Sequence, residues 1–277
     1  TLAQLYMNLE EIDSALVHLE NAALITKDKA YKGRLHFIQG QLYNKQGLTD
    51  SAQTAFQKVI DLKRKAPRTY RVNAFLEQIL NFDYERGDLL ALDILLETLV
   101  EDRENRPYLD RIYHVMAKHY LTLDEDSTAV VYFNKSLRRK SKDSYLNALN
   151  YHTIADLNFD DYNYTLAGAY YDSTLTHYKK NSKPHRLVKK RRDNLEDVIF
   201  YESIAKENDS ILKLTAMPAD ALEAYFDNYI KTLKEEAEKE EAEKAIKAQA
   251  TAPKTNMATT KTKKGGGFYF YQSTTVA

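Results

Sequence analysis

A pair of residues at a fixed spacing recurs along the chain and limits what it can fold into. Each pair is a small or aliphatic residue followed four positions later by a large apolar one, and successive pairs begin 37, 40, 37 and 38 residues apart. The pairs are Ala15 and Leu19, Ala52 and Phe56, Leu92 and Leu96, Ala129 and Phe133, and Ala167 and Tyr171. A repeat of this period predicts a solenoid in which each unit packs only against its neighbours.

The spacing matches the tetratricopeptide repeat (TPR), a helix–turn–helix unit whose second helix, helix B, carries this pair. Its first helix, helix A, carries a small and an aromatic residue, twelve and nine positions before the small residue of helix B. Three units supply both, namely Ala3 and Tyr6, Gly40 and Tyr43, and Ala117 and Tyr120. The third unit has Leu80 and Asp83 instead, and the fifth has Ala155 and Asn158. We therefore predict an all-α TPR solenoid over residues 1–180, with about five units, the first truncated.

The composition supports long helices, because the 277 residues include only 8 glycines and 5 prolines. Two of the glycines, Gly47 and Gly87, fall between the predicted helices A and B of their units. A residue that follows a helix often needs a positive φ, which glycine adopts without strain. We expect both glycines to mark the inter-helix turns.

Three Asp-Ser dipeptides stand at or just before the helix-B alanines: Asp13-Ser14, Asp50-Ser51 and Asp126-Ser127. Their side-chain oxygens could accept hydrogen bonds from the free N–H groups of the first turn, which predicts that they cap helix B. The same short sequence resembles an O-glycosylation acceptor of some periplasmic bacterial proteins. Modification at these sites is therefore an alternative that capping does not exclude.

Residues 181–233 are predicted to form capping helices. An apolar stripe lies on one side of their first part, and Pro218 suits the first turn of a further helix whose apolar face is expected to pack on the end of the solenoid. The stripe comprises Leu195, Val198, Ile199, Tyr201 and Ile204, and the later face comprises Leu222, Tyr225, Phe226, Tyr229, Ile230 and Leu233.

Residues 234–267 are predicted to form a charged helix followed by a flexible linker. Lys234 to Lys244 is polar on all sides and carries Glu–Lys pairs four residues apart, whereas the segment from Ala250 to Gly267 has no apolar periodicity. Residues 268–277 then begin with Phe268-Tyr269-Phe270-Tyr271, which predicts the start of a strand belonging to a truncated region.

Charge and cysteine content exclude some classes of function. Forty basic residues balance forty acidic ones, so no overall field would attract nucleic acid or an anionic membrane. The absence of cysteine excludes disulfides and thiolate metal sites but does not settle the compartment. The longest apolar stretch, Leu89 to Val100, is interrupted by charges, so no transmembrane span is predicted. Because Thr1 is not a Met, any targeting signal is expected outside this sequence.

No group of residues predicts catalysis. His114 and His119 are five residues apart and so lie on different faces of a helix, and no HExxH motif is present. Asp156, Asp160 and Asp161 cluster near a turn, where capping explains them. No glycine-rich loop precedes a helix to hold a phosphate. We predict that the chain is not an enzyme and has no cofactor or metal site.

The surface most often used by TPR proteins is the concave face built from helices A. Counting along each unit places a set of candidate partner-binding residues there, and this set does not reproduce the Lys/Asn clamp that captures C-terminal carboxylates. The candidates are Arg34, Phe37, Gln41, Glu77, Asn81, Tyr84, Arg111, His114, Lys118, His152 and Asp156.

Two basic stretches stand out near the predicted fifth unit. The first is Arg138-Arg139-Lys140, and the second runs from Lys179 to Arg192. Solvated helix ends would account for both. The alternative is a patch that binds a partner with an acidic surface.

The chain resembles a known family through its repeat array and, more specifically, through two segments of its C-terminal part. The segment from Asn208 to Pro218, and Gly266-Gly267-Phe268-Tyr269-Phe270-Tyr271 followed by Thr274-Thr275-Val276-Ala277, are similar to the TPR lipoprotein of the type IX secretion and gliding-motility machinery. The resemblance covers essentially the whole chain. The sequence departs from the family at Gln272-Ser273, where the family has Asn-Pro.

The resemblance implies an outer-membrane lipoprotein that faces the periplasm, with its lipid anchor upstream of this sequence. It further implies a non-enzymatic adaptor that links the outer-membrane translocon to periplasmic components of the motor ring, with protein partners and no nucleic acid. An alternative is a cytoplasmic TPR regulator that binds peptides or nucleic acid. A third is a peptidoglycan-processing enzyme whose catalytic domain would lie elsewhere.

Overall fold

The computed structural model describes residues 2–251, with side-chain burial for residues 2–241. Ten helices form five consecutive pairs: α1 (Leu2–Asn8) with α2 (Ile12–Ile25), α3 (Lys29–Gln46) with α4 (Thr49–Asp61), α5 (Arg68–Leu80) with α6 (Leu89–Glu101), α7 (Leu109–Thr122) with α8 (Asp126–Arg138), and α9 (Ser144–Asp160) with α10 (Tyr164–His177). Two short 3-10 helices, η1 (Lys63–Lys65) and η2 (Arg103–Tyr108), join successive pairs. The predicted all-α fold is confirmed over the described residues.

Three further helices follow the pairs: α11 (Lys183–Asn194), α12 (Glu196–Thr215) and α13 (Ala219–Thr251). The chain divides into two compact units, residues 1–206 and residues 207–277, and the division falls inside α12. The segment predicted to cap the solenoid, residues 181–233, is therefore shared between the units. The predicted strand at residues 268–277 and nearly all of the predicted linker lie outside the described residues.

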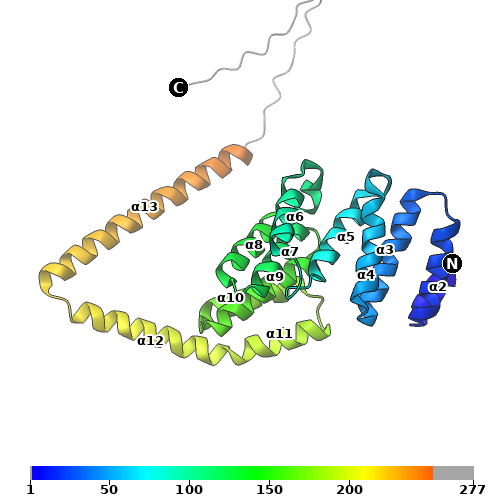
Figure 1. Cartoon of the computed structure of the whole chain (residues 1–277). Helices are drawn as coiled ribbons and strands as arrows, with labels where there is room; N and C mark the ends of the chain where they lie inside the picture. Colours follow the sequence, from blue (N-terminus) through cyan, green and yellow to red (C-terminus); the bar gives the residue numbers. More distant parts are fainter. Residues whose placement is uncertain (1, 252–277) are drawn as a thin grey trace, which may run out of the picture. The chain divides into compact units, whose positions relative to one another are not determined.

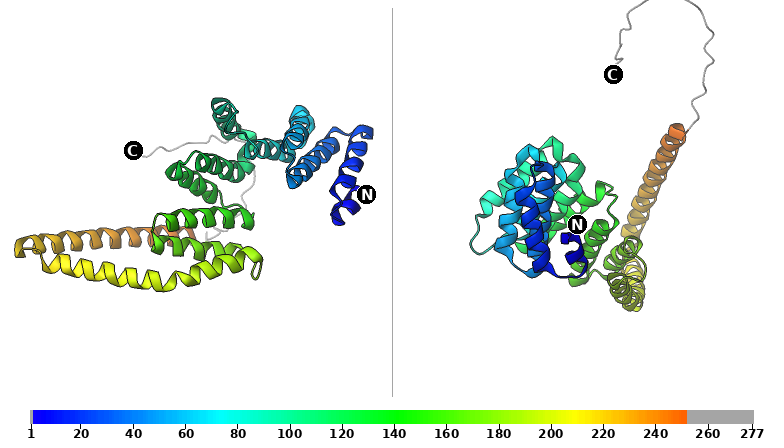
Figure 2. Two further views of the ribbon diagram at one scale, coloured as in Figure 1. Left: turned by 60° about the horizontal axis from the view of Figure 1, so that its bottom comes forward. Right: turned by 90° about the vertical axis from the view of Figure 1, so that its right-hand side faces the viewer.

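The five helix pairs of the first unit lie side by side in chain order (Figures 1 and 2). From the second pair onward, the first helix of each pair contacts the first helix of the next pair: α3 contacts α5, α5 contacts α7, and α7 contacts α9. The hydrophobic core is continuous in the same sense, because each cluster combines one pair with the helix that follows it. The arrangement is the nearest-neighbour packing that the repeat predicts.

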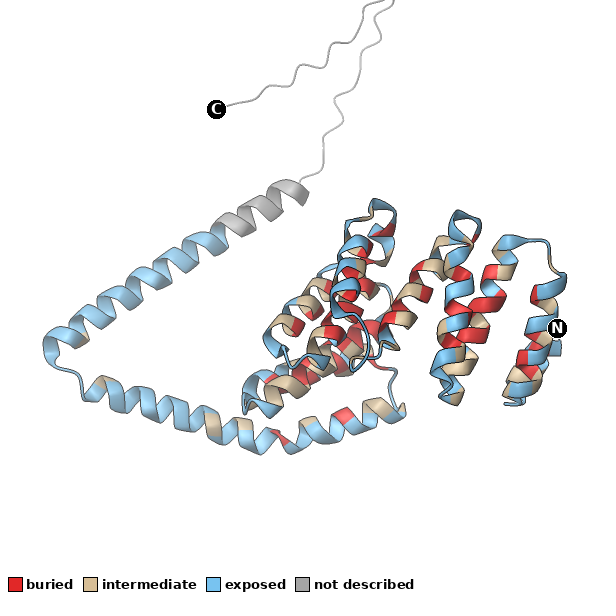
Figure 3. Cartoon of the chain, in the orientation of Figure 1, coloured by how far each residue is buried: buried red, intermediate tan, exposed pale blue. Residues whose placement is uncertain are grey.

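All ten residues of the repeated pairs are buried, including Phe56, Phe133 and Tyr171, which have no measurable exposure. In Figure 3, the buried residues gather on the sides of the helices that face their neighbours in the array. Gly40 shows why a small residue is needed where helices A and B cross, since a Cβ there would lie 2.4 Å from a ring carbon of Phe56. The pattern of small and large residues therefore reflects how helices A and B pack against each other.

The third pair departs from the others, as its sequence does. Leu80, which the spacing places at the helix-A crossing, is 43% exposed, so that assignment is wrong. The helix ends there, and residues 81–88 form a turn much longer than Gly47-Leu48 of the second pair. The long turn is largely offset by a shorter first helix, because α5 has 13 residues where α3 has 18. The spacing of 40 in place of 37 comes mainly from the connection before α5, which spans residues 62–67, whereas the connection before α3 spans residues 26–28. Because Leu92 stands where the other units have alanine, the backbones of α5 and α6 approach each other less closely.

Both glycines lie in inter-helix turns, as expected, but only Gly47 has a positive φ. It follows α3 with φ 74°, and its N–H bonds the carbonyl of Asn44. Gly87 lies in the turn between α5 and α6 but does not have a positive φ. A Cβ at Gly87 would lie 2.2 Å from Cζ of Phe82 and 2.5 Å from the carbonyl oxygen of Asp83, so this glycine is needed for a close approach.

The prediction that the Asp-Ser dipeptides cap helix B is also wrong. Helices α2, α4 and α8 begin at Ile12, Thr49 and Asp126, and none has a side-chain hydrogen bond at its N-cap. The aspartates lie inside the first turn, where they still interact favourably with the helix dipole. Side-chain caps occur at other residues, namely Asp28 of α3, Asp88 of α6, Asp143 of α9 and Ser182 of α11.

The segment after the fifth pair packs only in part. Val188 and Leu195 are buried, and Ile199 packs against the core of α9 and α10. Val198, Tyr201 and Ile204 of the predicted stripe are exposed, so the stripe covers the solenoid over only part of its length.

In the second unit, α13 is one uninterrupted helix that includes the charged segment from Lys234 to Lys244, as predicted. The aromatic side chains of Tyr225, Phe226 and Tyr229 are exposed, and the prediction that this helix packs on the solenoid stays a prediction. No helix in the described part of the chain is long and apolar enough to cross a membrane.

Candidate protein-binding surface

The candidate residues come from helices A of the second to fifth pairs and from the turn that follows α5. We call the outward-facing side of α3, α5, α7 and α9 the helix-A surface. Because these helices contact one another in sequence, residues at equivalent positions of neighbouring units meet across it. The structure therefore decides which candidates are free and which are engaged with a neighbouring unit.

In α3, Arg34 and Gln41 are exposed, whereas Phe37 is only 8% exposed. The ring of Phe37 lies 5.7 Å from that of Phe56 and 5.6 Å from that of Tyr70. The prediction that Phe37 is a surface residue is therefore wrong. Counting positions along the repeat assigned Phe37 to the exposed side of α3. That side is partly covered, because α3 packs against both α4 and α5.

Glu77 and Asn81 bind back to α3. Asn44 donates from Nδ2 to Oε2 of Glu77 at 3.0 Å and accepts from Nδ2 of Asn81 at 2.7 Å. Burial raises the pKa of Glu77, and the hydrogen bond from Asn44 and the charge of Lys118 oppose that shift. These three side chains form a polar link between the second and third units.

Tyr84 lies in the long turn after α5 and joins a buried histidine. Its hydroxyl is 3.0 Å from Nδ1 of His119, whose Nε2 is 3.0 Å from Oδ1 of Asp93. Burial raises the pKa of Tyr84, which makes its hydroxyl a weaker nucleophile at neutral pH. The hydrogen bonds between Tyr84, His119 and Asp93 thus hold the turn against α6 and α7. They do not make an activated nucleophile of the Tyr84 hydroxyl.

Two candidates of α7 reach the fifth unit. Nδ1 of His114 lies 2.6 Å from Oδ1 of Asn150, and Nδ2 of Asn150 donates to Oγ of Ser136 at 2.8 Å. A guanidinium nitrogen of Arg111 lies 3.5 Å from a carboxylate oxygen of Asp143. Burial lowers the pKa of His114. The third candidate of this helix, Lys118, is exposed.

His152 and Asp156 belong to a cluster at the junction of α9, α10 and α11. Oδ1 of Asp156 accepts from the hydroxyl of Tyr171 at 2.6 Å and from a guanidinium nitrogen of Arg191 at 2.6 Å. Nε2 of His152 lies 3.6 Å from the other carboxylate oxygen. Burial and the neighbouring carboxylate raise the pKa of Tyr171. Arg191, from the second basic stretch, therefore holds α11 onto the fifth pair.

Most of the candidates are thus engaged in contacts between units, and Arg34, Gln41 and Lys118 are the three exposed ones. The engaged residues hold the helix-A surface in one arrangement before any partner binds, which lowers the entropic cost of binding. Whether the surface binds a partner stays a prediction. Among the described residues, no group of three His, Asp or Glu side chains could hold a metal ion.

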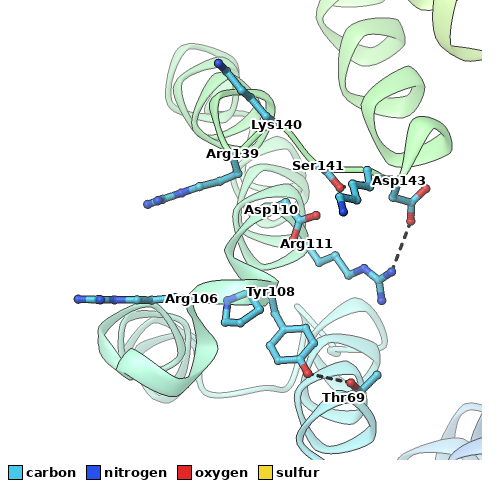
Figure 4. Close-up of a pocket in the computed structure, with 11 residues that line it drawn as sticks. Thr69, Arg106, Tyr108, Asp110, Arg111, Arg139, Lys140, Ser141 and Asp143 are labelled. Atoms are coloured by element: carbon cyan, nitrogen blue, oxygen red, sulfur yellow. Dashed lines mark hydrogen bonds and ion pairs between the residues drawn. The ribbon is translucent and has the colours of Figure 1, made fainter. Parts of the chain in front are cut away.

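A second set of residues, which the sequence did not predict to lie together, consists of the cations near the N-terminal ends of α7 and α9 (Figure 4). From the sequence, Arg139 and Lys140 belong to a basic stretch, and Arg111 is a candidate residue on helix A of the fourth unit. Arg106 in η2 and Lys142 in the α8–α9 loop join them in space. The only signal in the sequence was the run of cations after α8, because the other members come from different units.

Comparison with known families matches residues 33–65 to the family described as Tetratricopeptide repeat. The match covers α3 from Gly33, all of α4 and η1. No curated protein matches the chain. The five packed pairs and this match show an all-α TPR-type helical-repeat solenoid. The repeat indicates a scaffold for protein–protein interaction and no catalytic family.

Proposed function

We propose that this chain is an adaptor of the type IX protein secretion and gliding-motility machinery, anchored at the outer membrane and facing the periplasm. In this role it links the translocon to periplasmic components of the motor ring. It acts by holding proteins together and performs no chemical step.

The observation that carries the scaffold part of the proposal is the helix-A surface. Its polar residues are fixed by bonds between units, such as Asn44 to Glu77 and His114 to Asn150, while Arg34, Gln41 and Lys118 remain exposed. A pre-organised surface with free cationic and amide groups suits the capture of a protein partner.

The assignment to this machinery is supported by sequence resemblance. The segment from Asn208 to Pro218 lies at the end of α12 and in the turn before α13. The aromatic segment from Gly266 to Tyr271 lies outside the described residues. Both occur after a TPR array, in the order in which the family has them.

Affinity purification of the intact protein from detergent-solubilised membranes tests the proposal. We expect to recover outer-membrane translocon and periplasmic ring components together with the tagged chain. A matched sample in which Gln41 and Lys118 are both replaced by glutamate should recover less of them at the same expression level. Recovery of cytosolic proteins alone, with no membrane component, would contradict the proposal and favour a cytoplasmic TPR regulator.

A further inference from the structure

A basic pocket opens where the third, fourth and fifth pairs meet at the N-terminal ends of α7 and α9 (Figure 4). Its volume is about 640 Å³, and its walls come from α5, η2, the start of α7 and the loop from Arg139 to Asp143. We call it the α7–α9 pocket. Five of the side chains that line it are cationic: Arg106, Arg111, Arg139, Lys140 and Lys142.

Two of the five cations are held in place by neighbours. Arg111 lies against Asp143 and also donates to Oδ1 of Asn73 at 3.3 Å. The guanidinium of Arg139 lies 5.5 Å from the ring centre of Tyr113, whose hydroxyl it reaches at 3.4 Å. Figure 4 shows Arg106 and Arg139 extending to the same side of the pocket.

The other three cations, Arg106, Lys140 and Lys142, have no ion pair or side-chain hydrogen bond with any residue in the described part of the chain. All three are exposed. The pocket therefore presents positive charge that the folded chain does not neutralise.

The two carboxylates of the pocket wall offset the charge of the five cations only in part. Asp143 is already engaged as the N-cap of α9, where Oδ1 accepts from the N–H of Leu146 at 3.1 Å, and its Oδ2 faces Arg111. Asp110 is the only other carboxylate among the lining residues. Both α7 and α9 begin at the pocket, and the positive ends of their dipoles also favour an anion.

The pocket has an ordered floor that is partly apolar. The hydroxyl of Tyr108 lies 2.8 Å from Oγ1 of Thr69, which ties η2 to α5. The loop is fixed as well, because Oγ of Ser141 accepts from the N–H of Asp143 and the carbonyl of Ser141 accepts from Asn147. Pro107 and Tyr108 add apolar area beside the cations. A ligand with carboxylates and carbon chains fits this mixture.

We propose that the α7–α9 pocket binds an acidic, extended segment of a protein partner through carboxylate contacts with Arg106, Lys140 and Lys142. This inference rests on the proposed role as a protein-binding scaffold, and it adds a site and a partner chemistry that the helix-A candidates do not supply. A peptide is favoured over nucleic acid because the cations are confined to one pocket and the chain has net charge zero, without the continuous basic surface that tracks a phosphate backbone.

Fluorescence anisotropy with the intact protein tests the site. The probe is an oligoglutamate peptide of about eight residues carrying an uncharged dye, since extended residues span about 3.3 Å each and this length crosses the pocket. Oligoglutamine and oligo(dT) of the same length serve as neutral and nucleic-acid comparisons. We expect oligoglutamate to bind, added salt to weaken it, and the other two to bind more weakly.

The paired variant R106E/K142E should weaken oligoglutamate binding by about tenfold or more, because two attractive contacts become repulsive. The control K27E/R86E reverses two exposed cations in other turns and should bind like the unmodified protein. Circular dichroism of all variants checks that the helices are retained. Equal binding by R106E/K142E, no binding by the unmodified protein, or tighter binding of oligo(dT) would each overturn the proposal.

The test is separable from that of the proposed function. If R106E/K142E loses oligoglutamate but still recovers membrane partners, the pocket serves a partner other than the recovered ones and the adaptor role stands. If the intact protein binds oligoglutamate at the pocket but recovers no membrane component, the site stands and the adaptor role falls.

Discussion

His114 and Asn150 join the first helices of the fourth and fifth units through a bond of 2.6 Å between Nδ1 and Oδ1. Asn150 has no exposed surface, and it passes the contact on to Ser136, whose hydroxyl donates to the carbonyl of Asp110 at 2.6 Å. This series of hydrogen bonds leads from α7 to α9, from α9 to α8, and from α8 back to α7. It holds in place the start of α7, where the basic pocket lies.

Removing Asn150 should therefore destabilise the protein strongly. The variant N150A leaves the N–H of His114 without its acceptor, and a buried polar group left unpaired costs about 1–3 kcal/mol. It also removes one of the two hydrogen bonds of the Ser136 hydroxyl, which keeps its bond to the carbonyl of Asp110. We expect the free energy of unfolding in urea to fall by about 2 kcal/mol or more. The control is N134A on α8, whose side chain bonds only to the carbonyl of Val130. Equal losses for the two variants would contradict the network.

Stability should fall on acidification through the buried histidines. Burial lowers the pKa of His114 and of His36 below the ordinary value of 6.5. The folded state then binds a proton less readily than the unfolded state, so this contribution is complete above pH 6.5 and is lost as the pH falls below it. Urea unfolding across this range should show a smaller loss for H114Q than for the unmodified protein. The same pH dependence in both would exclude His114 as its source.

The repeated large residue of helix B should dominate the stability of its unit. Phe133 has no exposed surface, and F133A should reduce the free energy of unfolding by about 3–5 kcal/mol through lost burial and a cavity. Val131, on the same helix, is 51% exposed, and V131A should change it by no more than about 0.5 kcal/mol. Thermal unfolding followed by circular dichroism compares the two, and similar midpoints would contradict the packing described for α8.

Gly47 and Gly87 should respond differently to substitution. At Gly47, with φ 74° and open space around it, G47A should cost about 1 kcal/mol and G47N less, since asparagine tolerates a left-handed backbone. At Gly87 the obstacle is Phe82 and the carbonyl of Asp83, so G87N should be no better than G87A. Urea unfolding of the four variants measures this, and a rescue by asparagine at Gly87 would show that its φ is the constraint after all.

The repeat could be found from the sequence because the crossing of two helices needs a small residue and a large one at fixed positions. Every such pair proved to be buried. The third unit could be placed only roughly, because its extra residues lie mainly in the connection between α4 and α5 and because α5 ends at Leu80, which leaves that residue at the surface. The capping prediction failed because the sequence pattern does not distinguish an Asp-Ser pair at the N-cap from one at the first residues of the helix, where these pairs lie.

The binding surface was harder to predict. Counting positions identifies which residues lie on helix A, but it does not reveal that Glu77, Asn81 and Asp156 are already bonded to neighbouring units. The α7–α9 pocket could not be assembled from the sequence, because Arg106 and Lys142 meet only through the stacking of successive units. Sequence patterns within one repeat predict the two helices of that repeat. The surfaces formed between repeats depend on contacts between residues that are far apart in the sequence.

Photo-crosslinking in intact cells tests whether the chain holds protein partners on its helix-A surface. A benzophenone side chain is placed at Gln41 or Lys118 on helices A, and at Val17 or Val131 on helices B, all four being exposed positions. We expect crosslinks to proteins of the secretion machinery from Gln41 and Lys118 and few or none from Val17 and Val131. Crosslinks from the helix-B positions alone, or none from any position, would contradict it.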